Sequence, residues 1–217
     1  VCLMLSPVSA WADHSENKIL IQNNGQVKSF DSFARETLNL IAEKRNWQGR
    51  TASQTLVDQL SRPTEMLDTP WIRTRYRPLL SELGLPIERQ FFSYNEINAS
   101  IDKIRAFVIS AQKKRDGDQR PTALEQKAEA LFGQWIAVEE LRSGQSVRLI
   151  PAALGDQWLS PLIVEGPRAD EFRHLLELWK NKDSVGFETA CAQWNRKINE
   201  STQGQYRTKI DLEVLYH

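Results

Sequence analysis

Residues 24–47 read NGQVKSFDSFARETLNLIAEKRNW, and this stretch carries the strongest local folding signals in the chain. Asn24-Gly25 lies between two short segments, residues 19–22 and 26–28, in which apolar and polar side chains alternate. An Asn-Gly pair in this setting is typical of a type I′ turn, because both central residues of that turn need a positive φ. We therefore predict a small β-hairpin at this point.

A helix is predicted directly after the hairpin. Ser29 suits the N-cap position, and Asp31 and Glu36 come early in the helix, where the partial positive charge of the N-terminus favours acids. One apolar stripe at helical spacing follows: Phe30, Phe33, Ala34, Thr37, Leu38 and Ile41. We expect this helix to pack on a core, to continue toward Trp47 and to stop at Gly49.

Composition places the chain among helical globular proteins. It has 217 residues, with 28 basic and 28 acidic side chains, so the formal net charge is zero. This balance lacks the basic excess of a nucleic-acid binder, and we expect no nucleic-acid partner. The seven tryptophans are expected as core or interface anchors, because their large rings gain most from burial.

Residues 1–12 are expected to lie outside the folded domain. Residues 1–8 are mostly apolar, and Ala10-Trp11-Ala12 has the small-x-small form of a cleavage site. Two interpretations stay open, a secretory signal peptide or a clipped membrane anchor. Both export the chain to the periplasm. The remainder has no apolar run near the ~20 residues that span a bilayer.

The rest of the chain predicts a mainly α fold, with a single helical domain over residues 13–217. Ser93 with Glu96, and Thr122 with Glu125, have the spacing of capping boxes and begin two long helices. Joined by a short polar turn, these helices should form an antiparallel hairpin. Residues 169–180 predict a further helix, and Ser184 is expected to cap the next one. Residues 147–150 predict a further short strand, besides the N-terminal hairpin, and residues 209–217 alternate as a strand would.

Candidate catalytic and metal-ligating groups are sparse. His14, His174 and His217 are far apart, and no Cys or His spacing matches a zinc site. No phosphate-binding loop, dinucleotide fingerprint or nucleophile elbow is present, so we do not expect this segment to be catalytic. Cys191 has no partner cysteine beyond Cys2 of the predicted signal, and we expect a buried, inert thiol.

Two sets of residues are candidate binding sites. His174 is a candidate axial ligand for haem iron, but we favour an ordinary surface histidine beside Glu171 and Glu177. Lys28, Asp31 and Arg35 are spaced to share the start of the first helix. They are candidates for docking a partner protein or haem propionates. We favour a cluster of salt bridges that fixes the hairpin against the helix.

The same opening stretch resembles a known family. Gly25, Lys28, Asp31, Phe33, Ala34 and Arg35 match a Gly-x-x-Lys-Pro-Leu-Asp-Thr-Phe-Ala-Arg pattern. This pattern is found in the extracytoplasmic segment of system II cytochrome c biogenesis proteins of the CcsB/CcsA or ResB/ResC type. Ser29 and Phe30 stand where the family has Pro and Leu. Weaker agreement continues along the chain at Pro70-Trp71, Leu83-Gly84-Leu85, Leu149-Ile150-Pro151, Trp158, Ser160, Glu213 and Tyr216, whereas His217 replaces an Asn.

The resemblance implies a membrane protein that carries haem outward and attaches it to apocytochromes c. This segment would support or dock, with Trp158 as one more docking candidate, while the membrane half handles haem. Haem is then implied for the full protein, and none is expected tightly bound here. The implied partners are a membrane part of the same protein or a partner subunit, and apocytochrome c, on the periplasmic side of the inner membrane. The alternative is a free periplasmic helical adaptor with no haem role.

Overall fold

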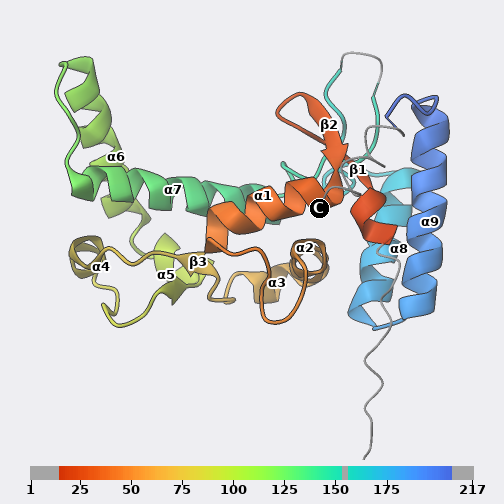
Figure 1. The fold of residues 1–217 in the computed structure, drawn as a ribbon, viewed down its shortest axis with the longest axis horizontal. Coiled ribbons are helices and arrows are strands. Elements are labelled where there is room, and N and C mark those ends of the chain that lie inside the picture. The colour runs from red at the N-terminus through yellow and green to blue at the C-terminus, as the bar shows by residue number, and fades with distance from the viewer. Residues whose placement is uncertain (1–14, 153–155, 207–217) are drawn as a thin grey trace, which may run out of the picture.

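The computed structural model describes residues 15–152 and 156–206. These ranges are mainly helical, with two small antiparallel strand pairs, which confirms the predicted fold class (Figure 1). The predicted signal segment and the alternating segment at residues 209–217 lie outside the described residues. The helices are α1 Phe30–Ala42, α2 Ala52–Ser61, α3 Pro63–Met66, α4 Arg77–Leu83, α5 Tyr94–Asn98, α6 Ile101–Asp116, α7 Ala123–Arg142, α8 Pro167–Lys180 and α9 Ser184–Ser201, with a 3-10 turn at Ser15–Lys18.

The N-terminal hairpin forms as predicted. Strands β1 (Leu20–Asn23) and β2 (Gln26–Ser29) pair antiparallel, with Asn23 opposite Gln26. Asn24 and Gly25 have φ values of 50° and 75°, as both central residues of a type I′ turn require. The register places Ile21 and Leu20 in the core, which ties the hairpin to the helical part of the molecule.

Helix α1 begins as predicted and ends earlier than predicted. The Ser29 hydroxyl accepts a hydrogen bond from the Ser32 backbone N–H at 3.1 Å. The helix stops at Ala42, because Glu43 adopts a left-handed conformation with φ 50° and its N–H bonds back to the Asn39 carbonyl. The predicted continuation to Gly49 is therefore wrong.

The two long helices α6 and α7 form the predicted antiparallel hairpin (Figure 1). Thr122 caps α7 with the expected capping box. Ser93 also forms its capping box, but it opens only the short helix α5, and the chain turns at Ala99 and Ser100 before α6 begins. At α9 the N-cap is Asp183 instead of the predicted Ser184, and its carboxylate accepts from the Gly186 N–H.

The further strands lie elsewhere than predicted. Strands β3 (Ile72–Arg73) and β4 (Phe91–Phe92) form the second pair, and two residues each are too few for a periodic sequence signal. The predicted strand at residues 147–150 is an extended segment that makes one bridge, between Ile150 and Leu159.

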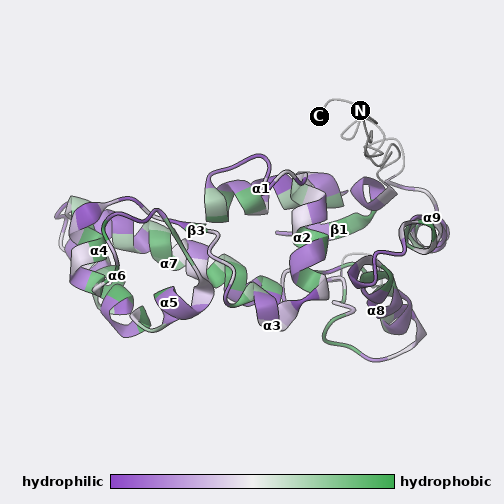
Figure 2. Cartoon of the chain, turned by 90° about the horizontal axis from the view of Figure 1, so that it is seen from below, coloured by the Kyte–Doolittle hydropathy of each residue, from purple (hydrophilic) through white to green (hydrophobic). Residues whose placement is uncertain are grey.

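A single hydrophobic core runs through the described residues, from Ile19 in the N-terminal segment to Ile198 in α9. Figures 1 and 2 show an elongated molecule, with α1 and α2 in the middle, α4–α7 at one end and α8 and α9 at the other. The predicted stripe of α1 is buried along its length, and Trp71 and Phe92 are completely buried near it. Among the described helices, none has the length and apolar character needed to cross a bilayer.

Candidate functional site

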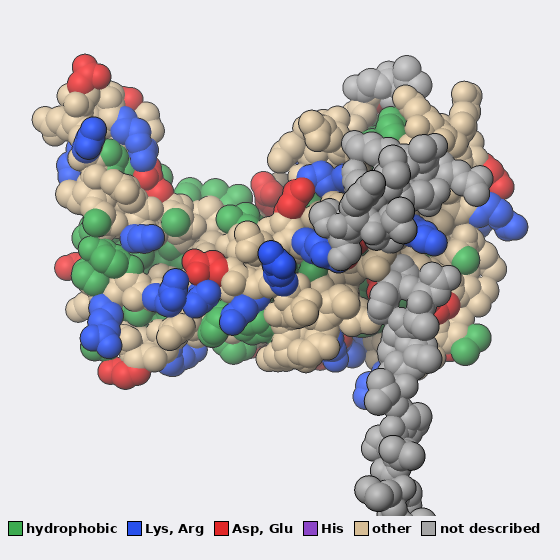
Figure 3. Space-filling view, in the orientation of Figure 1, with side chains coloured by type: hydrophobic (Ala, Val, Ile, Leu, Met, Phe, Trp, Pro, Cys, Tyr) green, Lys and Arg blue, Asp and Glu red, His purple; other side chains and the backbone are tan. Residues whose placement is uncertain are grey.

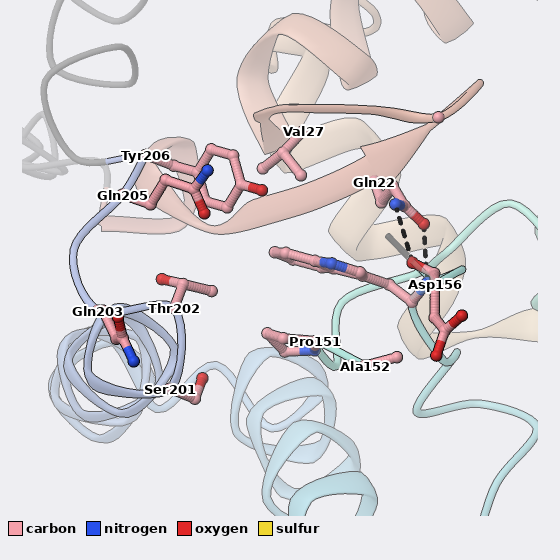
Figure 4. A pocket seen from close by; sticks show the side chains of 12 residues that line it. Gln22, Val27, Pro151, Ala152, Asp156, Ser201, Thr202, Gln203, Gln205 and Tyr206 are labelled. Carbon is pink, nitrogen blue, oxygen red and sulfur yellow. Dashed lines mark hydrogen bonds between the residues drawn. The ribbon is translucent and has the colours of Figure 1, made fainter. Parts of the chain in front are cut away.

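A cavity of about 690 Å³ lies beside the N-terminal hairpin (Figure 4). Three elements that are distant in sequence form it: the hairpin, the segment around residues 151–158, and the end of α9. Its lining residues are Gln22, Gly25, Val27, Pro151, Ala152, Asp156, Trp158, Ser201, Thr202, Gln203, Gln205 and Tyr206. The volume is within the usual range for small-molecule pockets.

The Gln22 side chain holds two walls of this cavity together. Its amide oxygen accepts a hydrogen bond from the Trp158 backbone N–H at 2.7 Å, and its amide nitrogen donates to the Asp156 carbonyl at 3.4 Å (Figure 4). The Gln22 backbone N–H also donates to the Arg148 carbonyl at 2.9 Å. The segment around residue 158 is thereby fixed against the outer edge of β1.

Aromatic rings supply the apolar part of the cavity lining. Trp158 is only 6% exposed and meets Tyr206 edge to face, with ring centroids 6.2 Å apart. Val27 of β2 lines the same space. Trp158, predicted as a docking residue, is thus mostly buried, and its ring forms part of the cavity wall.

The polar part of the lining is nearly uncharged. The hydroxyls of Ser201 and Thr202 donate to the Ile198 carbonyl, and the amides of Gln203 and Gln205 are exposed at the end of α9. Among the described lining residues, Asp156 is the sole charged side chain. Because no Lys or Arg is among them, the cavity suits an uncharged polar segment better than an anion such as a haem propionate.

Lys28, Asp31 and Arg35 do not line this cavity. Lys28 pairs with Glu36 at 2.7 Å and so links β2 to α1. The Asp31 carboxylate is buried, accepting from Arg35 Nε at 2.7 Å and from the Ser53 hydroxyl at 3.1 Å. Lys28 and Arg35 therefore form salt bridges at the start of α1. Their partners differ, because Lys28 bonds to Glu36 and Arg35 bonds to Asp31.

His174 lies exposed on α8, and the two acids predicted to flank it are engaged elsewhere. Glu171 pairs with Lys197 at 2.6 Å, and Glu177 lies 3.9 Å from Lys180. Within the described residues, no three His, Cys, Asp or Glu side chains come together as metal ligands would.

Cys191 is completely buried in α9, as predicted. Burial, with further contributions from Glu16 and Glu188, raises the pKa of its thiol far above the usual value. A thiol held in the protonated form is a poor nucleophile and a poor metal ligand. Cys191 is therefore a packing residue.

Gln22, Gln203 and Tyr206 are cavity residues that the sequence did not indicate. Gln22 is an ordinary polar position in an alternating strand, and its contacts are with residues 134 and 136 positions away. No local sequence pattern predicts such a contact.

Comparison of the chain with protein-family models gave no match, and comparison with curated proteins gave none either.

Proposed function

We propose that the chain is the extracytoplasmic accessory domain of a cytochrome c maturation membrane protein of the system II type. The observation that carries the proposal is the block from Gly25 to Arg35, in which Gly25, Lys28, Asp31, Phe33, Ala34 and Arg35 match the family pattern. They form one continuous unit, which comprises the hairpin turn, β2 and the first turns of α1. Gly25 and Val27 of this unit also line the cavity.

In this role the domain docks and does not catalyse. The cavity, with its amides, hydroxyls and aromatic rings, takes an uncharged polar segment of the membrane part or of a partner subunit. Haem stays with the membrane part, because stable ligation of haem iron needs an axial ligand in an apolar pocket. His174 is exposed on a helix surface, which favours this division of labour.

The alternative is a free periplasmic adaptor with no haem role. The feature that favours it is the absence, in the described residues, of any cluster of metal-ligating side chains. The two proposals differ in one cellular consequence, the covalent attachment of haem to c-type cytochromes.

Deleting the gene from its host and staining cell extracts for covalently bound haem tests the proposal. Loss of c-type cytochromes with b-type cytochromes retained would support it. Restored staining after the intact gene is reintroduced would show that the deletion caused the loss. Unchanged c-type cytochromes would refute it and leave the adaptor.

A pair of variants then tests the cavity. Gln203→Lys with Gln205→Lys places two cations at the cavity, and we expect reduced restoration of haem staining. Gln119→Lys with Gln193→Lys makes the same change in charge at exposed positions away from the lining. Equal restoration by both pairs would show that the cavity has no part in docking.

A further inference from the structure

A cluster of cations covers one face of a protein whose formal net charge is zero. We define the basic surface as Lys44, Arg45, Arg73, Arg75 and Arg77, which come from the loop after α1 and from the β3–α4 segment. Figure 3 shows Lys and Arg side chains gathered across the middle of this face, with few acidic groups between them. Five cations in so small a region produce a local positive potential.

A tight turn follows Lys44 and Arg45 in the chain. Trp47 and Arg50 exchange two backbone hydrogen bonds, of 3.0 and 2.9 Å, across the pair Gln48-Gly49. The φ values of these two residues, 49° and 79°, suit a tight two-residue turn. Lys44 and Arg45 are exposed and lie between the end of α1 and this turn.

Ring contacts between half-buried residues fix this turn beside β3. The Trp47 ring packs edge-on against Phe91 of β4 at 5.0 Å, and the Arg73 guanidinium lies over the same ring at 5.9 Å. From α7, the Gln134 amide donates to the carbonyls of Leu40 and Arg73, each at 3.1 Å. The two cationic segments thus form one preorganised surface.

The charge of this surface is poorly neutralised within the chain. Glu43 is shared between two cations, at 3.0 Å from Arg73 and 3.6 Å from Arg75. Lys44, Arg45 and Arg77 are exposed, and among the described residues none of the three has a carboxylate at ion-pair distance. An anionic partner would supply the missing counter-charge.

We propose that the basic surface docks the protein on the anionic headgroups of a phospholipid bilayer. Lys44, Arg45, Arg75 and Arg77 are exposed, whereas Arg73 is half-buried, and the phosphates of an anionic bilayer offer counter-charge to exposed cations across a broad face. The segment before β4 contains Ile87, which is 44% exposed. The Thr74 N–H donates a hydrogen bond of 3.0 Å to the Gln90 carbonyl of this segment. Because Thr74 lies between Arg73 and Arg75, this bond connects the segment that carries Ile87 to the basic surface, and an exposed aliphatic side chain there suits the boundary between headgroups and acyl chains.

Flotation with lipid vesicles tests this proposal independently of any role in cytochrome maturation. The purified protein should bind phosphatidylcholine vesicles that contain phosphatidylglycerol and should not bind vesicles of phosphatidylcholine alone. Binding should weaken as salt is raised, because ions screen exposed charges within ~10 Å at 0.1 M.

Charge-reversal variants locate the interaction. Lys44→Glu with Arg45→Glu should lower the partition onto anionic vesicles by more than about tenfold, since each basic residue near such a surface contributes to binding. Arg120→Glu with Lys127→Glu changes the net charge equally at exposed positions by the α6–α7 turn, and should lower it far less. Arg77→Glu gives a second test, because an acid in the first turn of α4 does not oppose helix formation.

Three results would overturn the proposal. The first is equal binding to both kinds of vesicle. The second is an equal loss in the Arg120 and Lys127 control, which would mean that only net charge matters. The third is binding to polyglutamate without binding to anionic vesicles, which would assign the basic surface to an acidic polypeptide.

Discussion

Asp31 shows how a single residue can carry both a family resemblance and a structural role. Its position in the first turn of α1 is favourable for an acid. Its two carboxylate oxygens are bonded to Arg35 on the same helix and to Ser53 on α2. Within this chain the Asp31–Arg35 ion pair lies inside α1, and the Ser53 hydroxyl joins Asp31 to α2.

Phe33→Ala should be strongly destabilising. The ring is 3% exposed and lies in the middle of the buried stripe, so its removal leaves a cavity and costs roughly 3–5 kcal/mol. Urea unfolding followed by circular dichroism measures the loss. Leu40→Ala, on the same helix at 49% exposure, is the control and should cost far less. Similar midpoints for the two variants would show that the stripe does not face a core.

At the scale of elements, the α6–α7 hairpin is joined by a buried acid at its turn end. Glu125 of α7 accepts from Lys114 and from Ser110 of α6, at 2.8 and 2.7 Å. It also accepts from the Thr122 backbone N–H, at 2.6 Å, in the capping box. One carboxylate therefore both caps a helix and pairs two helices.

The stability of the hairpin should depend on the charge of Glu125. The Lys114 ammonium, the Ser110 hydroxyl and the Thr122 N–H lower the pKa of this carboxyl from 4.5 to about 2. A lowered folded-state pKa means that its contribution is complete above pH 4.5 and is lost as the pH falls toward 2. Thermal midpoints measured across this range should fall less steeply in Glu125→Gln than in the unmodified protein. Glu88→Gln, at an exposed loop position, should leave the slope unchanged; a Glu125→Gln profile parallel to the original would contradict the assignment.

Gln134 joins three elements. Its side-chain amide satisfies the Leu40 carbonyl in the last turn of α1, where helices leave carbonyls unpaired, and the Arg73 carbonyl of β3. Gln134→Leu keeps the volume similar but orphans both carbonyls, so we expect a loss of about 1–3 kcal/mol in the free energy of unfolding. Gln126→Leu, at an exposed position of the same helix, serves as the control in the same denaturant titration. No difference between the two would mean that water replaces the Gln134 bonds.

At the scale of the whole molecule, the described surface has two sites that differ in charge. The cavity beside the hairpin has an almost uncharged lining, whereas the basic surface lies over the end of α1 and β3. A docking domain with both features would contact an uncharged polar segment at one place and an anionic surface at another.

Haem binding by the purified chain is expected to be weak and nonspecific. His174 stands exposed on α8, and haem iron is held stably only where an axial ligand sits in an apolar pocket. Titration should give no Soret shift beyond that of an unrelated control protein. A stoichiometric shift that disappears in His174→Ala would move the haem role onto this domain.

The sequence by itself determined the features that are stabilised by interactions between residues close in sequence. The φ requirements of Asn24-Gly25, the hydroxyls of Ser29 and Thr122 at helix starts and the stripe through Phe33 each act over one or two turns of chain. Such short-range effects leave a readable spacing. The hairpin, the starts of α1 and α7 and the helical class could therefore be predicted.

Tertiary structure alone decided where α1 ends, how α5 separates from α6, and where the cavity lies. Glu43 ends α1 beside Arg73, the Ser100 hydroxyl donates to the Leu83 carbonyl at the break before α6, and Gln22 bonds to Trp158 across 136 positions. Each contact joins residues that only the folded core brings together. The spacing of residues along the sequence therefore does not predict it. The cavity and the basic surface arise from these long-range contacts, and for that reason neither was visible in the sequence.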